Sequence, residues 1–146
     1  MTQQDKDLLL RDLCARLPYE VILSIGIFDN GSIKYHDKKL DYHNDWLSLI
    51  KLDGGYYFNG LFCKYSQFSA KPYLRPLASM TDKEREEYRK FSHYGAAGIR
   101  TNDFSEMVAV PSFEKMDYLN SHHFDYRGLI EKGLAIKAPE GMYKFE

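Results

Sequence analysis

The N-terminal residues carry a leucine at every fourth position, a spacing that predicts a helix over residues 2–17. Side chains four residues apart lie on one face of a helix, so these leucines form an apolar stripe: Leu9, Leu13 and Leu17. Thr2 is a suitable N-cap, because its hydroxyl can accept a hydrogen bond from the first turn. Pro18 ends the helix, because proline has no N–H and restricts the residue before it.

The next part of the chain, the strand region 20–70, is predicted to form short strands separated by turns. Strand-forming residues fill the segments 20–28, 32–36, 46–52 and 56–65. Turn sequences separate them at Asp29-Asn30-Gly31 and Asp53-Gly54-Gly55, since Asn and Gly tolerate a positive φ. Asn59-Gly60 marks a bulge or another tight turn, and the polar residues 37–45 are expected to form a loop. This pattern predicts an antiparallel meander or a small barrel.

The first helix predicted after the strands begins with a capping box. Thr81 and Glu84 have the spacing at which a cap hydroxyl and a carboxylate bond reciprocally to the backbone. We expect this charged helix to run over about 81–93, with Tyr88 and Phe91 facing inward.

A second helical region is predicted over about 112–132. Ser112 follows a proline and begins it, and its apolar face carries Phe113, Met116 and Leu119. Asp125 is expected to cap a further helical turn, which Gly133 ends.

Shorter segments complete the prediction of an α+β fold. Residues 71–80 contain two prolines and are expected to cross the molecule in an extended form, and short strands are predicted at 107–110 and 134–138. We therefore predict one domain, 1–146, with an N-terminal helix, a small antiparallel sheet or barrel of about four or five strands, and a helical C-terminal part.

Composition agrees with one folded domain and excludes some classes of protein. The 146 residues are 44% hydrophobic and 28% charged, and the net charge of −1 gives no overall attraction to nucleic acid or to a membrane. The N-terminus lacks the basic and apolar regions of a signal peptide, and no apolar stretch has the length of a membrane helix. We expect a cytoplasmic protein whose thiols, Cys14 and Cys63, are reduced and buried.

Three blocks of the sequence resemble a known family. KDLLLRDLCARLPYEV, KPYLRPLASMT and YLNSHHFDYRGLIEKGLAIKAPEGMY are similar to a family of short uncharacterised proteins from gut anaerobes and their phages or mobile elements. The resemblance implies a phage or mobile-element context. It implies no reaction and supplies no catalytic residues.

The densest group of candidate metal ligands is His122, His123 and Asp125. Neutral imidazole is a common metal ligand, so a small metal-dependent hydrolase is one interpretation. Adjacent helical histidines point about 100° apart, however, and rarely share an ion. We favour structural roles, in which His122 closes a helix and Asp125 caps the next turn, with no metal and no cofactor bound.

The acid-free stretch 54–80 is the main candidate for a binding face. It interleaves cations with aromatic residues, and the candidate binding residues are Tyr57, Lys64, Tyr65, Lys71, Tyr73 and Arg75. Such a mixture suits the stacking of single-stranded nucleic acid, but alternating aromatics also pack in sheets, and Tyr and Arg are frequent anchors of protein interfaces. Pro72 and Pro76 do not have the spacing of a polyproline ligand. We instead expect Tyr73 and Leu74 to hold this segment across the sheet or barrel and Arg75 to pair with an acid.

No nucleotide-binding, hydrolase or zinc-protease motif occurs in the sequence. This favours a non-enzymatic protein without excluding an enzyme, because active sites also assemble from scattered residues. We predict a binding or adaptor protein that acts on a protein partner through an aromatic-rich face. The alternative is a small barrel that binds single-stranded nucleic acid or RNA, and a metal-dependent hydrolase is the third interpretation.

Overall fold

The computed structural model describes residues 2–40, 56–58, 61–63, 68–91, 99–100, 107–108 and 112–145. Its helices are α1 (Gln3–Arg16), α3 (Asp82–Lys90) and α4 (Phe113–Ser121), with 3-10 turns at Leu17–Tyr19 and Leu77–Ser79. Its strands are β1 (Ile22–Asp29), β2 (Ser32–Lys39), β3 (Tyr56–Phe58), β4 (Leu61–Cys63), β5 (Phe68–Pro76), β6 (Ile99–Arg100), β7 (Met107–Val108), β8 (Phe124–Asp125) and β9 (Ile136–Lys137). In this part of the chain, no helix has the length and apolar character needed to span a bilayer.

Helix α1 begins and ends where the sequence predicts. The Thr2 side chain accepts a hydrogen bond from the Asp5 N–H, and the Asp5 carboxylate accepts one in return from the Thr2 N–H. After Arg16 the chain tightens into a 3-10 turn that contains Pro18. These local signals decide the helix ends because they satisfy or remove backbone groups that would otherwise lack a partner.

The hairpin of β1 and β2 is longer than predicted. Asn30 and Gly31 both have positive φ, 48° and 87°, which confirms the predicted tight turn. Pairing then continues as far as Ile22 opposite Lys39. The predicted loop over 37–45 is therefore wrong at residues 37–39, which belong to β2. A polar edge strand can pair through its backbone without an apolar pattern. Residues 41–45 lie outside the described residues.

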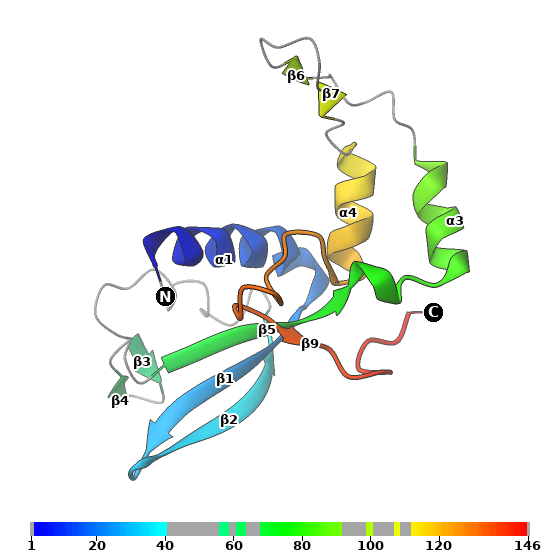
Figure 1. The fold of residues 1–146 in the computed structure, drawn as a ribbon. Coiled ribbons are helices and arrows are strands. Elements are labelled where there is room, and N and C mark those ends of the chain that lie inside the picture. The colour runs from blue at the N-terminus through cyan, green and yellow to red at the C-terminus, as the bar shows by residue number, and fades with distance from the viewer. Residues whose placement is uncertain are drawn as a thin grey trace.

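The main sheet is open and mixed, in the order β2-β1-β5-β8, with β9 also paired to β5 (Figure 1). β5 runs antiparallel to β1 but parallel to β8 and β9. The α+β class is confirmed. The barrel alternative is wrong, because the sheet is open, with β2 at one edge. A purely antiparallel sheet is also wrong, because the C-terminal half of β5 pairs in parallel with segments about 50 to 60 residues further along the chain. Arg75 lies opposite Phe124, and Tyr73 lies opposite Ile136.

Two small hairpins account for other predicted strands. The strand expected over 56–65 is divided into β3 and β4, which pair with Phe58 opposite Leu61. The bulge or tight turn predicted at residues 59–60 lies outside the described residues. β7 confirms a short strand in the segment 107–110 and pairs with β6. The predicted strand 46–52 lies outside the described residues.

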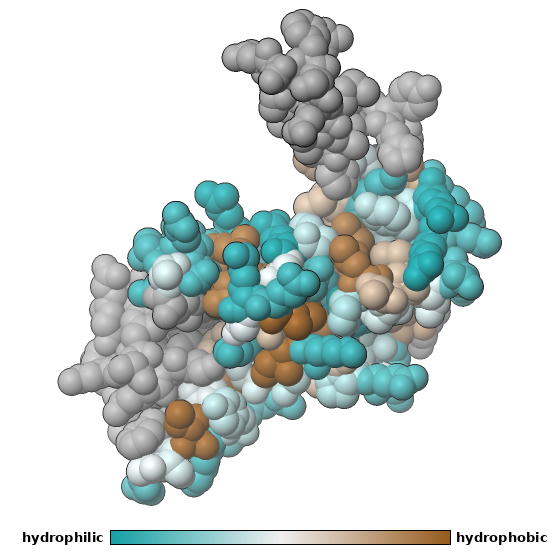
Figure 2. All heavy atoms as spheres, in the orientation of Figure 1, coloured by the Kyte–Doolittle hydropathy of each residue, from teal (hydrophilic) through white to brown (hydrophobic). Residues whose placement is uncertain are grey.

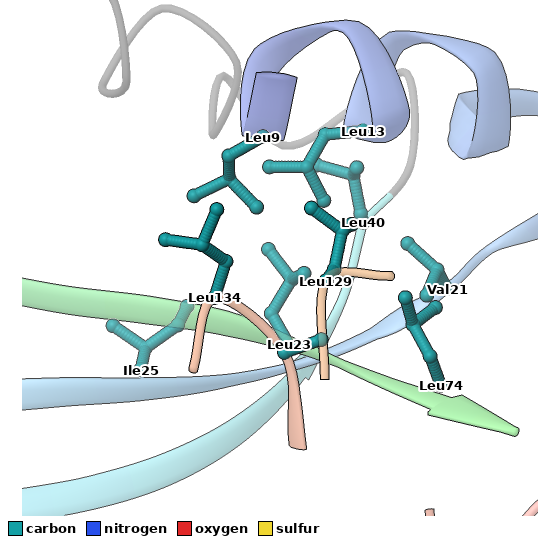
Figure 3. Close-up of a cluster of buried hydrophobic side chains, with 10 residues drawn as sticks. Leu9, Leu13, Val21, Leu23, Ile25, Leu40, Leu74, Leu129 and Leu134 are labelled. Atoms are coloured by element: carbon teal, nitrogen blue, oxygen red, sulfur yellow. The ribbon is translucent and has the colours of Figure 1, made fainter. Parts of the chain in front are cut away.

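The hydrophobic core lies between α1 and one face of the sheet. Leu9 and Leu13 point from α1 toward leucines of the loops and strands below (Figure 3), and the buried cluster comprises Leu9, Leu13, Val21, Leu23, Ile25, Leu40, Leu74, Leu129, Leu134 and Ala135. The predicted apolar stripe thus supplies the helical side of the core, with Leu17 only partly buried against it. Cys14 is exposed, so its predicted burial is wrong; it lies one position beyond the stripe.

A second apolar cluster joins α3 to α4, which lie side by side (Figure 1). Tyr88 and Phe91 face inward, as predicted, and contact Tyr118 of α4. The predicted apolar face of α4 is wrong at Phe113, which is 87% exposed, whereas Leu119 is buried and Met116 partly so. α3 is slightly shorter than expected and ends at Lys90, whereas α4 ends at Ser121 with His122 as its C-cap, as predicted.

The region predicted as a further helical turn forms hydrogen-bonded turns without a helix. The Asp125 carboxylate accepts hydrogen bonds from the N–H groups of Leu129 and Ile130, which confirms its capping role. Gly133, at a φ of 69°, ends the turns, and β9 follows as the predicted last strand. The helical turn predicted after Asp125 is therefore wrong: β8 pairs with β5, and the chain continues in turns as far as β9.

Candidate functional site

The structure brings together two groups of residues that are far apart in the sequence. β5 carries Arg75, and the parallel strand β8 continues from the two histidines at the end of α4. The Arg75 N–H donates to the His123 carbonyl at 2.8 Å. This meeting of β5, β8 and the C-terminal tail, residues 139–145, is the junction, and it contains most of the candidate chemistry that the structure describes.

Arg75 pairs with an acid, as predicted. Its guanidinium donates to both carboxylate oxygens of Glu84, at 2.7 and 3.0 Å, and lies over the rings of Phe124 and Phe145, at 4.3 and 5.1 Å from their centroids. Burial opposes ionisation of Glu84, but hydrogen bonds from Arg75 and Thr81 outweigh it and lower the pKa of Glu84 to about 2. The cation is therefore neutralised within the protein and is poorly placed to hold a phosphate.

His122 has the predicted structural role. It is the C-cap of α4, its Nδ1 lies 3.0 Å from the Tyr118 carbonyl, and its ring stacks between those of Tyr118 and Phe145, with centroids at 4.0 and 4.7 Å. A histidine at a helix C-terminus interacts favourably with the carbonyls there. This geometry, together with the capping bonds of Asp125, supports the structural interpretation of these residues.

His123 differs from its neighbour. It is buried, its φ of 57° is left-handed, and its ring stacks on Tyr143 with centroids 3.9 Å apart. Burial and the nearby cations Arg16, His122 and Arg75 lower the pKa of His123 to about 3, so the ring is neutral near pH 7. Within the described residues, no three ligand side chains come together to hold a metal, and the hydrolase interpretation gains no support there.

The C-terminal tail closes the junction through Tyr143. Its hydroxyl donates to the Tyr73 carbonyl of β5 at 2.8 Å and accepts from the Ile22 N–H of β1 at 3.1 Å. The phenol thus bridges the two strands just beyond their last paired residues, Leu23 and Pro72. Burial raises the pKa of Tyr143 to about 12, so the hydroxyl keeps the proton that it donates. Sequence reasoning missed this residue, whose only signal is the aromatic pair at 143 and 145.

Pockets lie on both sides of this tail. One, of about 420 Å³, is bordered by Arg75, Thr81 and Phe145; the other, of about 290 Å³, is bordered by Lys39, His123 and Tyr143. The Lys39 ammonium is 2.9 Å from the Glu20 carboxylate, and Arg75 is paired with Glu84. Lys39 and Arg75, at the borders of the pockets, are therefore each paired with an acid, and the ring of His123 is neutral near pH 7.

A buried ion pair fixes the junction to α1. Arg16 and Asp12 are both fully buried, with Nε and Oδ2 2.7 Å apart, and Arg16 also donates to the Phe124 carbonyl at 2.7 Å. Arg127 lies 3.4 Å from the same aspartate. The four-residue spacing of Asp12 and Arg16 was the signal available in the sequence.

The predicted aromatic-rich face is only partly within the described structure. Lys64 and Tyr65 lie outside the described residues, and Tyr57 belongs to β3. The remaining candidates, Lys71, Tyr73 and Arg75, are half-buried in β5. They alternate with the buried Pro72 and Leu74, so they lie on the sheet face opposite the core.

The same outer face continues across β1 to β2, the strand at the outer edge of the main sheet (Figure 1). All eight residues of β2 are exposed, including Ile33 and Tyr35 at 49% and 63%. Both side chains lie over Gly26 of β1, where an added Cβ would be 2.9 Å from the Tyr35 ring. Figure 2 shows a small hydrophobic patch, in brown, at this end of the hairpin.

The hydrogen-bond pattern of the hairpin determines which backbone groups β2 presents outward. The Leu40 N–H donates to the Val21 carbonyl at 2.8 Å, which makes this pair a hydrogen-bonded one. Hydrogen-bonded pairs alternate along an antiparallel ladder, so the even-numbered residues of β2 bond to β1. The N–H and C=O groups that point away from the sheet therefore belong to Ile33, Tyr35, Asp37 and Lys39.

In comparisons with known proteins, no protein-family model, no curated protein and no solved structure matches this chain.

Proposed function

We propose that this protein is a non-enzymatic binding or adaptor protein that holds a protein partner by adding one strand of that partner to β2. The observation that carries the proposal is the exposed eight-residue edge strand, whose outward N–H and C=O groups have no strand beside them among the described strands. Such an edge is a template for an extended segment of another chain. The phage or mobile-element context implied by the resemblance, and the cytoplasmic location expected from the sequence, belong to the same proposal.

The exposed apolar side chains on β2 support a specific partner. Ile33 and Tyr35 form a small hydrophobic surface next to the outward backbone groups, and large aromatic side chains contribute strongly to protein interfaces. In strand addition the backbone supplies affinity, whereas alternate side chains supply specificity. β2 offers both within one strand.

Binding of single-stranded nucleic acid, the alternative, has less support. That interpretation needs exposed aromatic rings beside free cations. Among its candidate residues in the described structure, Arg75 is paired with Glu84, and Lys71 and Tyr73 are half-buried.

The proposal can be tested by blocking the edge without disturbing the hairpin. The Asp37 N–H points away from β1, so Asp37→Pro removes an outward donor and leaves the ladder with β1 intact. Asp37→Ala is the matched control, because it removes the same carboxylate but keeps the N–H. A library of random extended peptides displayed on a carrier surface would be selected on the wild-type protein, and the enriched peptides would be measured against both variants.

We expect the enriched peptides to bind Asp37→Ala about as well as wild type and Asp37→Pro at least about tenfold more weakly. Equal binding to both variants, or no enrichment, contradicts strand addition at β2. Saturable binding of a fluorescent single-stranded oligonucleotide at about 150 mM salt, unaffected by Asp37→Pro, would instead support the nucleic-acid alternative.

A further inference from the structure

We infer that a partner strand pairs antiparallel with β2 and is anchored at its N-terminal end by a large aromatic side chain, which enters the pocket of about 290 Å³ bordered by Lys39, His123 and Tyr143. This inference rests on the proposed function and adds a second contact site for the same partner. It follows from the position of the pocket along β2, from the residues that line it, and from the distance that a side chain must reach to enter it.

The pocket lies at the C-terminal end of β2. Lys39 is the last residue of this strand, Ile22 is its register partner on β1, and both border the pocket. Alternate residues of a strand share a face, so the side chain of Lys39 lies on the same outer face as those of Ile33 and Tyr35. A strand added to β2 would therefore run past Ile33 and Tyr35 and reach the border of the pocket.

The residues that line the pocket suit an aromatic side chain. Ile22 and Met142 border it, together with the ring-bearing residues His123, Tyr143 and Phe145. The rings of His123 and Tyr143 are stacked, with centroids 3.9 Å apart. Aromatic rings pack favourably against other rings and against methionine sulfur. An aromatic side chain of the partner would therefore find favourable contacts in the pocket.

The charged groups at the border do not favour a charged side chain. The Lys39 ammonium is 2.9 Å from the Glu20 carboxylate, and the imidazole of His123 is neutral near pH 7. Lys144 also borders the pocket and forms no ion pair within the described residues. An acidic side chain is therefore the competing occupant, and the test includes it.

Size and reach select large side chains. Drug-sized ligands occupy pockets of about 300–1,000 Å³, so a pocket of about 290 Å³ suits a single large side chain better. Neighbouring strands lie about 4.8 Å apart, so a side chain of an added strand must cross the width of β2 to enter the pocket. Tyrosine and tryptophan are large and are frequent anchors of protein interfaces.

The backbone on two sides of the pocket has an uncommon conformation. Glu20 and His123, which both border the pocket, have φ values of 53° and 57°. A positive φ is uncommon for residues other than glycine and costs energy that the surrounding structure must offset. Residues of this kind are concentrated at functional sites, which supports a binding role for the pocket.

Synthetic peptides that differ only at the anchor position provide the direct test. Antiparallel pairing is slightly more stable per residue than parallel pairing, and it places the first residue of a peptide opposite Lys39 when the fifth and seventh lie opposite Tyr35 and Ile33. Each capped eight-residue peptide therefore has valine at its fifth and seventh positions, threonine elsewhere, and tryptophan, alanine or glutamate first. In fluorescence polarisation, we expect wild-type protein to bind the tryptophan peptide at least about tenfold more tightly than the other two.

A variant that fills the pocket provides the reciprocal test. Ser121 borders the pocket, so Ser121→Tyr would occupy it with a ring of the protein itself. Ser79→Tyr is the matched control, because Ser79 borders the pocket on the other side of the tail. Each serine hydroxyl donates to the carbonyl three residues before it, so both substitutions remove the same kind of hydrogen bond.

We expect Ser121→Tyr to lower the affinity for the tryptophan peptide to that for the alanine peptide, and Ser79→Tyr to leave it unchanged. Circular dichroism checks that both variants are folded, and the peptide series on wild-type protein tests the inference without them.

The outcomes separate this inference from the proposed function. If the tryptophan peptide binds no more tightly than the alanine peptide, or if the glutamate peptide binds most tightly, the aromatic anchor is wrong. Unchanged affinity in Ser121→Tyr, or an equal loss in both serine variants, also overturns it. Strand addition at β2 still stands in these cases if Asp37→Pro weakens binding and Asp37→Ala does not. If Asp37→Pro and Asp37→Ala bind every peptide equally, the proposed function itself is wrong and the inference falls with it.

Discussion

Tyr143→Phe tests whether the C-terminal tail is an integral part of the sheet. The substitution removes one hydroxyl and keeps the ring that stacks on His123. It takes away the partner of the Tyr73 carbonyl, at 2.8 Å, and of the Ile22 N–H, at 3.1 Å. A buried backbone group that loses its partner costs about 1–3 kcal/mol. Because both bonds are only part-buried, water can replace some of the loss, and we expect a total of about 2 kcal/mol.

The measurement is the free energy of unfolding from urea denaturation at pH 7, with an unchanged m-value as the sign that only stability has changed. Tyr35→Phe is the matched control, because it removes a hydroxyl from an exposed tyrosine and should change stability by less than about 0.5 kcal/mol. A loss below that value for Tyr143→Phe would mean that the hydroxyl does not bridge β1 and β5, and the account of the junction would be wrong.

Further predictions concern the core and the buried ionisable groups. Leu13→Ala should cost about 2–5 kcal/mol in urea denaturation, since Leu13 is fully buried, and an unchanged midpoint would mean that α1 does not pack on the sheet. The pKa of His123 is about 3 in the folded protein, below the ordinary 6.5, so its contribution to the free energy of unfolding should be full above pH 6.5 and fall toward pH 3. His123→Asn, chosen because Asn tolerates a positive φ, should reduce the fall in the free energy of unfolding between pH 6.5 and 5. An unchanged slope in the variant would contradict the burial of this ring. The pKa of Glu84 is about 2 in the folded protein, below the ordinary 4.5, so its contribution to the free energy of unfolding should be present above pH 4.5 and lost as the pH falls toward 2. Glu84→Gln should flatten the dependence of the free energy of unfolding on pH in that range. The wild-type dependence in the variant would argue against the ion pair with Arg75.

Features set by neighbouring residues could be predicted from the sequence. The N-cap at Thr2, the capping box at Thr81, the turn at Asn30-Gly31 and the capping bonds of Asp125 all satisfy backbone groups within five residues. The hydrophobic stripe of α1 was also evident, because helical periodicity identifies a buried face without knowledge of what covers it.

Features set by long-range pairing could not be predicted in this way. The parallel pairing of β5 with β8 joins Arg75 to Phe124, and nothing local to either segment specifies it. The barrel was wrong for this reason: alternation identifies strands but not their neighbours. The ion pair of Arg75 was expected, whereas its partner Glu84 and the bridging Tyr143 depend on the tertiary fold.

Amide hydrogen exchange of β2, measured by NMR, tests the central claim most directly. In the free protein, the N–H groups of Lys34, His36 and Lys38 bond to β1 and should exchange slowly, whereas those of Ile33, Tyr35 and Asp37 should exchange fast. Saturation with a peptide enriched on the wild-type protein should slow exchange of the second set at least about tenfold and leave the first set almost unchanged. Protection that does not alternate along β2, or that arises elsewhere while the second set remains fast, would contradict strand addition at this edge.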